Sequence, residues 1–365
     1  MTSLALLSII FALYYFITAV ACVWAVSRGL EEIRVCDQLR SEGVPKEWIP
    51  FLRPPSSFLP PSRLKMFLRA FFIAPLGYLA FMLSFSALYI YGAISGSHPL
   101  RIYPVIGYPL TVLLGIKIVV KGTPARVPVL VATHTGIFDI HVLASVDQKV
   151  AAVAKSEIRS FAFIGAVAKQ IGCIFVDRAD ETNRKIAGDV IREFMEEQRT
   201  RKDKTLIVFP EGTTTNHLYI IPFKTGVFAP LVSDTLKWFD GKKGKAITLA
   251  TEPRGNEPLT DTPLLIQPVR ITYPSPLYSF SVSTHQLVPF ALTFALPGGE
   301  VLLEYLEPVH REKNETAEEI AERVRDLIAA DGRLVKAEGS FRAHTAATLE
   351  VRRRCKGCID HQKTD

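Results

Sequence analysis

The chain has 365 residues, of which 48% are hydrophobic, and it carries a formal net charge of +7 at pH 7. This length and apolar content allow one large core or two small ones, so the size of the fold is not limiting. A positive charge favours a nucleic-acid partner in a soluble protein. Here the apolar residues gather near the N-terminus, so we expect a membrane and no nucleic acid.

The first predicted element is a transmembrane anchor over residues 1–30. No charged residue occurs from Met1 to Val26, and about 20 apolar residues suffice to span a bilayer. A cleaved signal peptide is the alternative. It is disfavoured because no Lys or Arg precedes the apolar run, which also exceeds the roughly 7–15 apolar residues of a typical signal peptide.

Residues 31–66 follow as a predicted linker, because charges of both signs lead into the proline-rich sequence RPPSSFLPPSRLK. A second uncharged run lies between Arg69 and Arg101, so residues 67–120 are expected to form a second membrane-associated segment. Pro75 and Gly77 near its start leave open whether it spans the bilayer or turns back within it. Its end is rich in β-branched residues, as in a buried strand.

From residue 121 to 335, short apolar runs alternate with helix-like segments. This pattern predicts an α/β domain with a mixed, partly parallel sheet flanked by helices, preceded by the N-terminal membrane segments. A capping box at Thr316 and Glu319 begins a closing amphipathic helix. Residues 231–263, rich in Lys, Gly and Pro, are expected to form an excursion between two core elements.

Residues 336–365 are predicted to be a basic, flexible tail. Cys355 and Cys358 lie within it, but a zinc site needs four ligands and only His361 is close by, so no metal is expected. The five cysteines are too few and too scattered for a disulfide framework and fit a reducing compartment.

The polar sequence HTGIFD interrupts an apolar stretch within residues 127–143. His134 would stand at the end of a strand and Asp139 in the first turns of a helix, whose side chains tilt back toward its N-terminus. The carboxylate can then fix the imidazole tautomer while the other ring nitrogen accepts a proton from a hydroxyl. Such spacing also arises by chance, so the motifs that follow must decide.

Three further motifs follow in order. GCIFVDR places Arg178 directly after a strand, where it could bind a phosphate or pair with a neighbouring aspartate on the surface. FPEGTTTN turns through Glu211 and Gly212, and Glu211 could accept from substrate hydroxyls or brace the turn. IQPVRITYP is a buried strand whose Pro268 suggests a sheet edge or a bulge.

These four motifs, in this order, resemble the pattern of the glycerolipid acyltransferase family, the 1-acylglycerol-3-phosphate and lysophospholipid acyltransferases, over residues 105–335. The resemblance implies that His134 deprotonates the acceptor hydroxyl and that Asp139 supports it. It implies a lysophospholipid acceptor at the bilayer and acyl-CoA as co-substrate, with no cofactor, in phospholipid synthesis or remodelling. The implied substrate-binding residues are Gly172, Phe175, Arg178, Glu211, Gly212, Thr213 and Pro268.

Within the family, FPEGTTTN followed by FKTGVF is more similar to the lysophosphatidylcholine and lysophosphatidylethanolamine branch than to the lysophosphatidate branch. Two alternatives remain: a lipid thioesterase or hydrolase that uses the same His134 and Asp139 pair, and a catalytically silent membrane scaffold, which would be expected to have lost the base. No Gly-x-Ser-x-Gly motif supports a hydrolase, and an intact His134 argues against the scaffold.

The basic residues that follow the first apolar run and precede the second predict that the intervening loop is cytosolic. If both runs crossed the bilayer, the catalytic domain would lie away from cytosolic acyl-CoA, which favours a re-entrant second segment. We expect an integral membrane protein of the endoplasmic reticulum with its active site facing the cytosol, or alternatively of a bacterial inner membrane.

Overall fold

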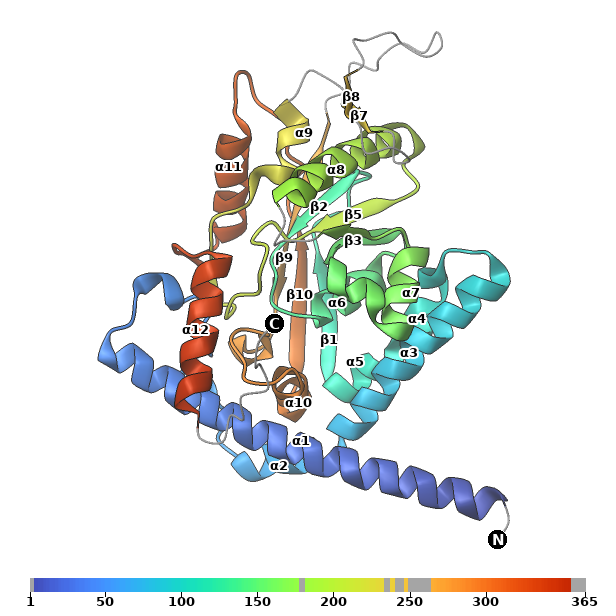
Figure 1. Cartoon of the computed structure of the whole chain (residues 1–365), viewed down its shortest axis with the longest axis vertical. Helices are drawn as coiled ribbons and strands as arrows, with labels where there is room; N and C mark the ends of the chain where they lie inside the picture. The colour runs from blue at the N-terminus through green and yellow to red at the C-terminus, as the bar shows by residue number, and fades with distance from the viewer. Residues whose placement is uncertain (1–2, 177–180, 233–236, 240–245, 249–263, 356–365) are drawn as a thin grey trace.

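A computed structural model of the chain describes residues 3–176, 181–232, 237–239, 246–248 and 264–355 (Figure 1). Its centre is a seven-stranded sheet with the order β1-β10-β9-β2-β5-β3-β4. Strands β9, β2, β5, β3 and β4 run parallel, whereas β10 is antiparallel to β9 and carries β1 parallel to itself. The predicted mixed, partly parallel sheet is therefore confirmed. The strands of the sheet are β1 (Ile116–Lys121), β2 (Val129–Ala132), β3 (Val150–Lys155), β4 (Ile174–Val176), β5 (Thr205–Val208), β9 (Ile266–Thr272) and β10 (Gly299–Tyr305).

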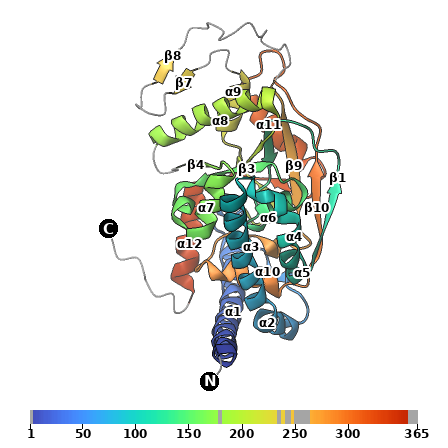
Figure 2. The ribbon, with the colours of Figure 1, turned by 90° about the vertical axis from the view of Figure 1, so that its right-hand side faces the viewer.

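Helices cover both faces of this sheet (Figure 2). Because side chains alternate along a strand, Val129 and Val131 of β2 face the layer that contains α8 and α11. Leu130 and Ala132 face the opposite layer, which contains α3, α6, α7 and α10. The helices are α1 (Ser3–Glu42), α2 (Arg63–Phe72), α3 (Ala74–Ser95), α4 (Tyr103–Ile106), α5 (Tyr108–Leu114), α6 (Phe138–Val146), α7 (Ala162–Gln170), α8 (Glu181–Arg201), α9 (Ala229–Val232), α10 (Leu287–Ala295), α11 (Ala317–Ala329) and α12 (Phe341–Arg354).

Two small sheets lie outside the central one. β6 (Tyr219–Ile220) pairs in parallel with β11 (Val335–Lys336). β7 (Lys237–Phe239) and β8 (Ala246–Thr248) form an antiparallel pair within the 231–263 excursion. The predicted capping box of α11 is present, since the Thr316 side chain accepts from the Glu319 N–H and the Glu319 side chain accepts from the Thr316 N–H.

Helix α1 is continuous to Glu42, so the predicted boundary between anchor and linker at residue 30 falls inside a helix. Its second half buries Ile33, Cys36 and Leu39, which are three residues apart and therefore share one face. Its first half leaves apolar side chains exposed, for example Leu7 at 62%, and projects beyond the domain in Figure 1. Both α1 and α3 are long and apolar enough to cross a membrane.

Helix α3 lies along the domain. Its buried residues, including Ala74, Gly77 and Phe81, recur every three to four positions and form one stripe. A β-carbon on Gly77 would lie 2.2 Å from the ring of Phe294 on α10, and the Phe81 ring packs against Phe138 of α6. The helix thus packs one face against the α/β domain and leaves an apolar face exposed. The predicted second segment also ends earlier than residue 120, because β1 already begins at Ile116.

The expectation of a sheet edge at Pro268 was wrong, because β9 lies between β10 and β2 inside the sheet. A bulge does lie next to it, since Leu306 bonds to Pro268 whereas Val309 pairs with Ile266, which leaves one extra residue in the partner segment. The Leu306 N–H donates to the Pro268 carbonyl over 3.0 Å, and an ordinary residue 268 would return a bond to the Leu306 carbonyl. Proline has no N–H. The side-chain amide of Gln267 donates to that carbonyl instead, over 2.9 Å, which makes the proline acceptable in an interior strand.

The predicted flexible tail contains a packed helix. Ser340 caps α12, and Ala343, Ala347 and Val351 bury one stripe of it beside the second half of α1. Arg354 forms an ion pair with Glu42 at the end of α1, with a distance of 2.6 Å. The prediction of a flexible tail relied on the basic composition of this segment and overlooked its stripe of small apolar residues at four-residue spacing. Residues 356–365, with Cys358 and His361, lie outside the described part of the chain.

Candidate active site

The candidate site lies where the carboxyl ends of three neighbouring parallel strands, β9, β2 and β5, meet at one edge of the sheet. Loops that follow such strands converge, and this edge is where α/β proteins build their sites. His134 follows β2 in the His134 loop (residues 133–137), which leads into α6. Glu211 follows β5, and Tyr273 follows β9 directly.

The predicted pair is formed. Nδ1 of His134 lies 2.9 Å from Oδ2 of Asp139. A carboxylate only accepts, so Nδ1 carries the proton and Nε2 is the nitrogen that can accept one. The Asp139 side chain is fully buried, whereas that of His134 is 21% exposed. The Asp139 end of the pair is therefore inaccessible to solvent, and the His134 end reaches the surface.

Three further donors hold the buried carboxylate. Oδ2 accepts from the backbone N–H groups of Thr135, at 2.7 Å, and Gly136, at 2.9 Å. Oδ1 accepts from the Tyr273 hydroxyl at 2.9 Å. Hydrogen bonds to a charged acceptor are strong, and together they offset the cost of burying the carboxylate. Asp139 is thus fixed in place before any substrate binds.

The loop after β5 braces His134 from the other side. The imidazole stacks on the Phe209 ring, with centroids 4.1 Å apart. Glu211 accepts from the His134 N–H through Oε1, at 3.2 Å, and from the Ile221 N–H through Oε2, at 3.4 Å. Burial raises the pKa of Glu211 to about 8, although these N–H donors oppose the rise. Of the two roles expected for Glu211, its contacts are those of a brace.

A second histidine, His217, joins the same network. It has a left-handed φ of 63°, and the Tyr273 N–H donates to its Nε2 over 3.1 Å. Nδ1 must therefore carry the proton, which it donates to the Thr135 hydroxyl oxygen over 2.9 Å. Burial lowers the pKa of His217 to about 4, so the ring is neutral at physiological pH.

His217 and Tyr273 are the functional-site residues that the sequence reasoning missed. Both lie in or next to motifs that were singled out, at the ends of FPEGTTTN and IQPVRITYP. No spacing rule connects them to Asp139, because Tyr273 lies 134 positions away from it. The alignment of β9 beside β2 brings them together.

The remaining predicted residues lie at three places in the fold, and Arg178 lies outside the described part of the chain. Gly212 and the buried Thr213 lie in the turn after Glu211, and Gly212 has a φ of +69° that favours glycine. Gly172 and Phe175 lie before and within β4, which is separated from β2 by β5 and β3, about 14 Å across the sheet. Pro268 lies within the sheet beside Val131.

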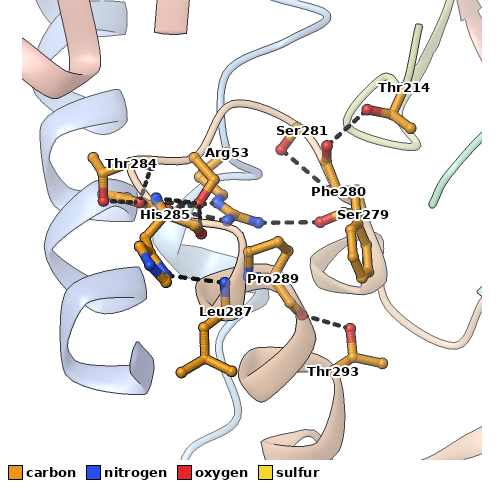
Figure 3. A network of polar contacts seen from close by, with 12 residues as sticks. Arg53, Thr214, Ser279, Phe280, Ser281, Thr284, His285, Leu287, Pro289 and Thr293 are labelled. Carbon is orange, nitrogen blue, oxygen red and sulfur yellow. Dashed lines mark hydrogen bonds and ion pairs between the residues drawn. The ribbon is translucent and has the colours of Figure 1, made fainter. Parts of the chain in front are cut away.

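The segment of residues 279–284 contacts both loops of the site, and Figure 3 shows it between Thr214 and Arg53. The Phe280 N–H donates to the Thr135 carbonyl over 2.8 Å. The Thr214 hydroxyl donates to the Phe280 carbonyl over 2.7 Å. A β-carbon on Gly136 would lie 2.4 Å from the Phe280 ring. This segment therefore joins the His134 loop to the loop after β5.

A buried ion pair connects the 279–284 segment to α1. Arg53 donates to the Ser279 carbonyl over 3.0 Å and to Oε2 of Glu32 over 3.1 Å. Oε1 of Glu32 accepts from the N–H and hydroxyl of Thr284, at 2.6 and 2.7 Å (Figure 3). The side chains of Arg53 and Glu32 are 1% and 0% exposed. The second half of the N-terminal helix is thus part of the scaffold of the site.

Comparison with known proteins agrees with this geometry. A sequence model of the family described as Acyltransferase matches residues 118–235. The lyso-ornithine lipid O-acyltransferase of Rhodobacter capsulatus is 36% identical over 129 residues, which cover 35% of this chain and 44% of that protein. The lysophospholipid acyltransferase LPEAT1 of Arabidopsis thaliana is 28% identical over 223 residues, which cover 59% and 47%.

Human lysophosphatidylcholine acyltransferase 1 is 30% identical over 118 residues, which cover 31% of this chain and 21% of that protein. The crystal structure of the 1-acyl-sn-glycerophosphate acyltransferase PlsC from Thermotoga maritima aligns with a TM-score of 0.44 and 19% identity, covering 73% of this chain and 92% of that one. The chain spans less than half the length of the first curated relatives it matches.

The mixed sheet, the His-Asp pair after its central strand and the matching family model define an acyltransferase domain. The four ordered motifs and the curated relatives support the glycerolipid acyltransferase family as the one that this domain resembles.

Proposed function

We propose that the chain is a membrane-bound O-acyltransferase that moves a fatty acyl group from acyl-CoA to the free hydroxyl of a lysophospholipid. The observation that carries this proposal is the exposure of the His134–Asp139 pair at one end: the buried Asp139 carboxylate fixes Nδ1 of His134, whose side chain is 21% exposed. The relatives are named as lyso-ornithine lipid, lysophosphatidylcholine and lysophospholipid acyltransferases, which supports a lysolipid acceptor.

In the proposed reaction, Nε2 of His134 takes the proton of the acceptor hydroxyl, and the oxygen attacks the thioester carbonyl. Asp139 stabilises the imidazolium that forms. The tetrahedral intermediate collapses with cleavage of the C–S bond, and the imidazolium gives its proton to the departing thiolate. The product is a diacyl lipid and free CoA.

The oxyanion of the intermediate requires donors near His134. The N–H groups of Thr135 and Gly136 already donate to Asp139. Backbone donors at the start of α6 would therefore come from Ile137 or Phe138. The exposed Ile137, at 39%, lies on the open side of the loop.

The decisive experiment incubates the purified protein in lipid nanodiscs with labelled acyl-CoA and a panel of acceptors: lysophosphatidylethanolamine, lysophosphatidylcholine, lysophosphatidate and lyso-ornithine lipid. We expect a labelled diacyl product from at least one acceptor. Labelled free fatty acid in its place would show a hydrolase, and recovery of intact acyl-CoA under all conditions would show a protein without this activity.

We further propose that the first half of α1 anchors the protein and that α3 enters the membrane without crossing it. The packing of α3 along α6 and α10 supports this placement, because a helix that crossed the bilayer would leave the domain. The active site would then face the cytosol, at the endoplasmic reticulum or, alternatively, at a bacterial inner membrane. The net charge of +7 would attract anionic lipid and CoA.

Topology mapping tests the placement. A single cysteine introduced at Ser340 in a cysteine-free background is expected to react with a membrane-impermeant maleimide from the cytosolic side of sealed microsomes. A cysteine on the α1 N-terminal half, such as Leu7→Cys, serves as a control for residues within the bilayer. Reaction of residue 340 only after permeabilisation would place the domain in the lumen and overturn the proposed orientation.

A further inference from the structure

The two oxygens of Asp139 have different partners. Oδ2 accepts from His134 and from two backbone N–H groups of the His134 loop, whereas Oδ1 accepts from the Tyr273 hydroxyl, which the strand β9 supplies. We propose that Tyr273 is a positioning residue for the acyl transfer: its hydroxyl orients the Asp139 carboxylate and, through it, sets the basicity of His134. This inference rests on the proposed function.

Tyr273 is suited to this role because it is buried. Its exposed fraction is 6%, and that of Asp139 is 0%, so water cannot replace the hydroxyl if it is removed. The rotation of a carboxylate about its last bond is soft. Without the donor at Oδ1, a buried acceptor would be left unsatisfied and its orientation would rest on the His134 loop alone.

Other groups hold the Tyr273 ring, so the position of the hydroxyl does not depend on its own hydrogen bond. The Tyr273 N–H donates to His217, and the His217 ring lies edge-on at a centroid distance of 5.8 Å. The Tyr278 ring stacks on the Tyr273 ring, with centroids 5.4 Å apart. Burial, reinforced by the charge of Asp139, raises the pKa of Tyr273 well above its usual value. The hydroxyl therefore remains a donor at every working pH.

The hydrogen bond has a definite effect on the base. A donor at Oδ1 draws negative charge away from Oδ2 and weakens the stabilisation of the His134 imidazolium. The hydrogen bond therefore affects how strongly His134 holds the proton that it takes from the acceptor. The titratable and charged groups that face the pair are Tyr273, His217 and Glu211, with Arg325 of α11 near Glu211.

The test compares Tyr273→Phe with a matched control, Tyr278→Phe. Each change removes one hydroxyl from a buried, stacked tyrosine, but the Tyr278 hydroxyl lies near the Gly298 backbone instead of Asp139. We expect Tyr273→Phe to lower kcat about tenfold and to move the acid limb of the kcat/KM profile to higher pH. Tyr278→Phe should leave the acid limb where it is.

A second substitution keeps the test valid if Tyr273→Phe does not fold. Replacement of Tyr273 by 3-fluorotyrosine keeps the ring and makes the hydroxyl a stronger donor, so the acid limb should move to lower pH. Product formation is followed by mass spectrometry across the pH range, with the melting temperature of each variant as a check on folding.

The outcomes separate the two proposals. If the wild-type protein makes no diacyl product, the proposed function fails. If the wild-type protein is active and the acid limb stays unmoved in the 3-fluorotyrosine protein, or moves equally in Tyr273→Phe and Tyr278→Phe, the role of Tyr273 is overturned and the proposed function stands.

Discussion

Two buried carboxylates, Asp139 and Glu32, are held in closely similar ways, although we propose a catalytic role for the first and a structural role for the second. Each is 0% exposed. Each offers one oxygen to a nitrogen-bearing side chain, His134 or Arg53, and the other to a hydroxyl, that of Tyr273 or Thr284. The environments of the two acids do not distinguish a catalytic pair from a structural one.

The partners make the difference. Arg53 is 1% exposed and stays protonated at all physiological pH values, so its pair with Glu32 can neither reach a substrate nor exchange a proton. His134 is 21% exposed and can change its protonation state. A buried acid therefore becomes part of a reaction when its partner both titrates and reaches the surface. The comparison predicts that substitutions in the His134–Asp139 pair lower kcat, whereas substitutions in the Arg53–Glu32 pair lower the free energy of unfolding.

The largest effect is expected from His134→Ala, which removes the proposed base. General base catalysis contributes factors of about 10²–10⁴, so we expect kcat for acyl transfer to fall about 10³-fold. The melting temperature should change little, because the side chain lies at the open end of the pair. Transfer at the wild-type rate by a correctly folded His134→Ala protein would refute the mechanism.

Arg53→Met should show the opposite pattern. It leaves the Glu32 charge buried without its cation, and breaking such a pair costs about 3 kcal/mol in the free energy of unfolding. Adding Glu32→Gln removes the stranded charge and keeps an oxygen for the Thr284 N–H, so the double variant should regain most of the loss. Denaturant unfolding in detergent measures both proteins.

The double variant is also expected to keep most of its kcat, since neither residue contacts His134 or Asp139. A double variant as stable as the wild type but with kcat reduced as far as in His134→Ala would show that the Glu32–Arg53 pair takes part in the reaction. The proposed distinction between the two pairs would then be wrong.

The sequence predicted the first pair and could not predict the second. His134 and Asp139 belong to one local motif, in which the end of a strand and the first turn of a helix fix their separation. Glu32 and Arg53 both lie in the predicted linker, residues 31–66, whereas Thr284 comes from a distant part of the chain. Their contact depends on how α1 packs on α10, and the pattern of hydrophobic residues in the sequence does not predict that packing.

Composition also misled the prediction of α12 and the boundaries of α1. In both, charged residues were interpreted as linker or tail, although each segment hides a narrow buried stripe, such as Ala343, Ala347 and Val351. The sheet was more predictable because its strands are continuous apolar runs. Pro268 was the exception, since the compensating bond from Gln267 is a tertiary contact.

Gly136→Ala should affect both regions, because Gly136 is where the 279–284 segment presses on the His134 loop. The new β-carbon would lie 2.4 Å from the Phe280 ring, and overpacking of this kind costs about 2 kcal/mol. We expect a loss of stability together with a fall in kcat. Adding Phe280→Leu makes room and should restore both; restoration of stability without kcat would show that the chemistry needs the Phe280 ring or Gly136 itself, and that relief of the overpacking is not enough.

The smallest effect on activity is expected from Glu211→Gln, which concerns a third buried carboxyl group. Because burial raises the pKa of Glu211 to about 8, the group is mostly neutral at pH 7, and a neutral amide is a close substitute. We expect kcat at pH 7 to stay within about twofold of wild type, since the substitution retains an acceptor for the His134 N–H.

The pH dependence of stability provides the sharper test of Glu211. A carboxyl group whose pKa is higher in the folded than in the unfolded protein binds more protons when folded, so its contribution to stability is complete below about pH 4.5 and is lost as the pH rises toward 8. The wild type should therefore lose stability relative to Glu211→Gln across this window. If the stability of the two proteins changed with pH in parallel, Glu211 would be charged in the folded protein. The protein would then bury two carboxylates, Glu211 and Asp139, both bonded to His134.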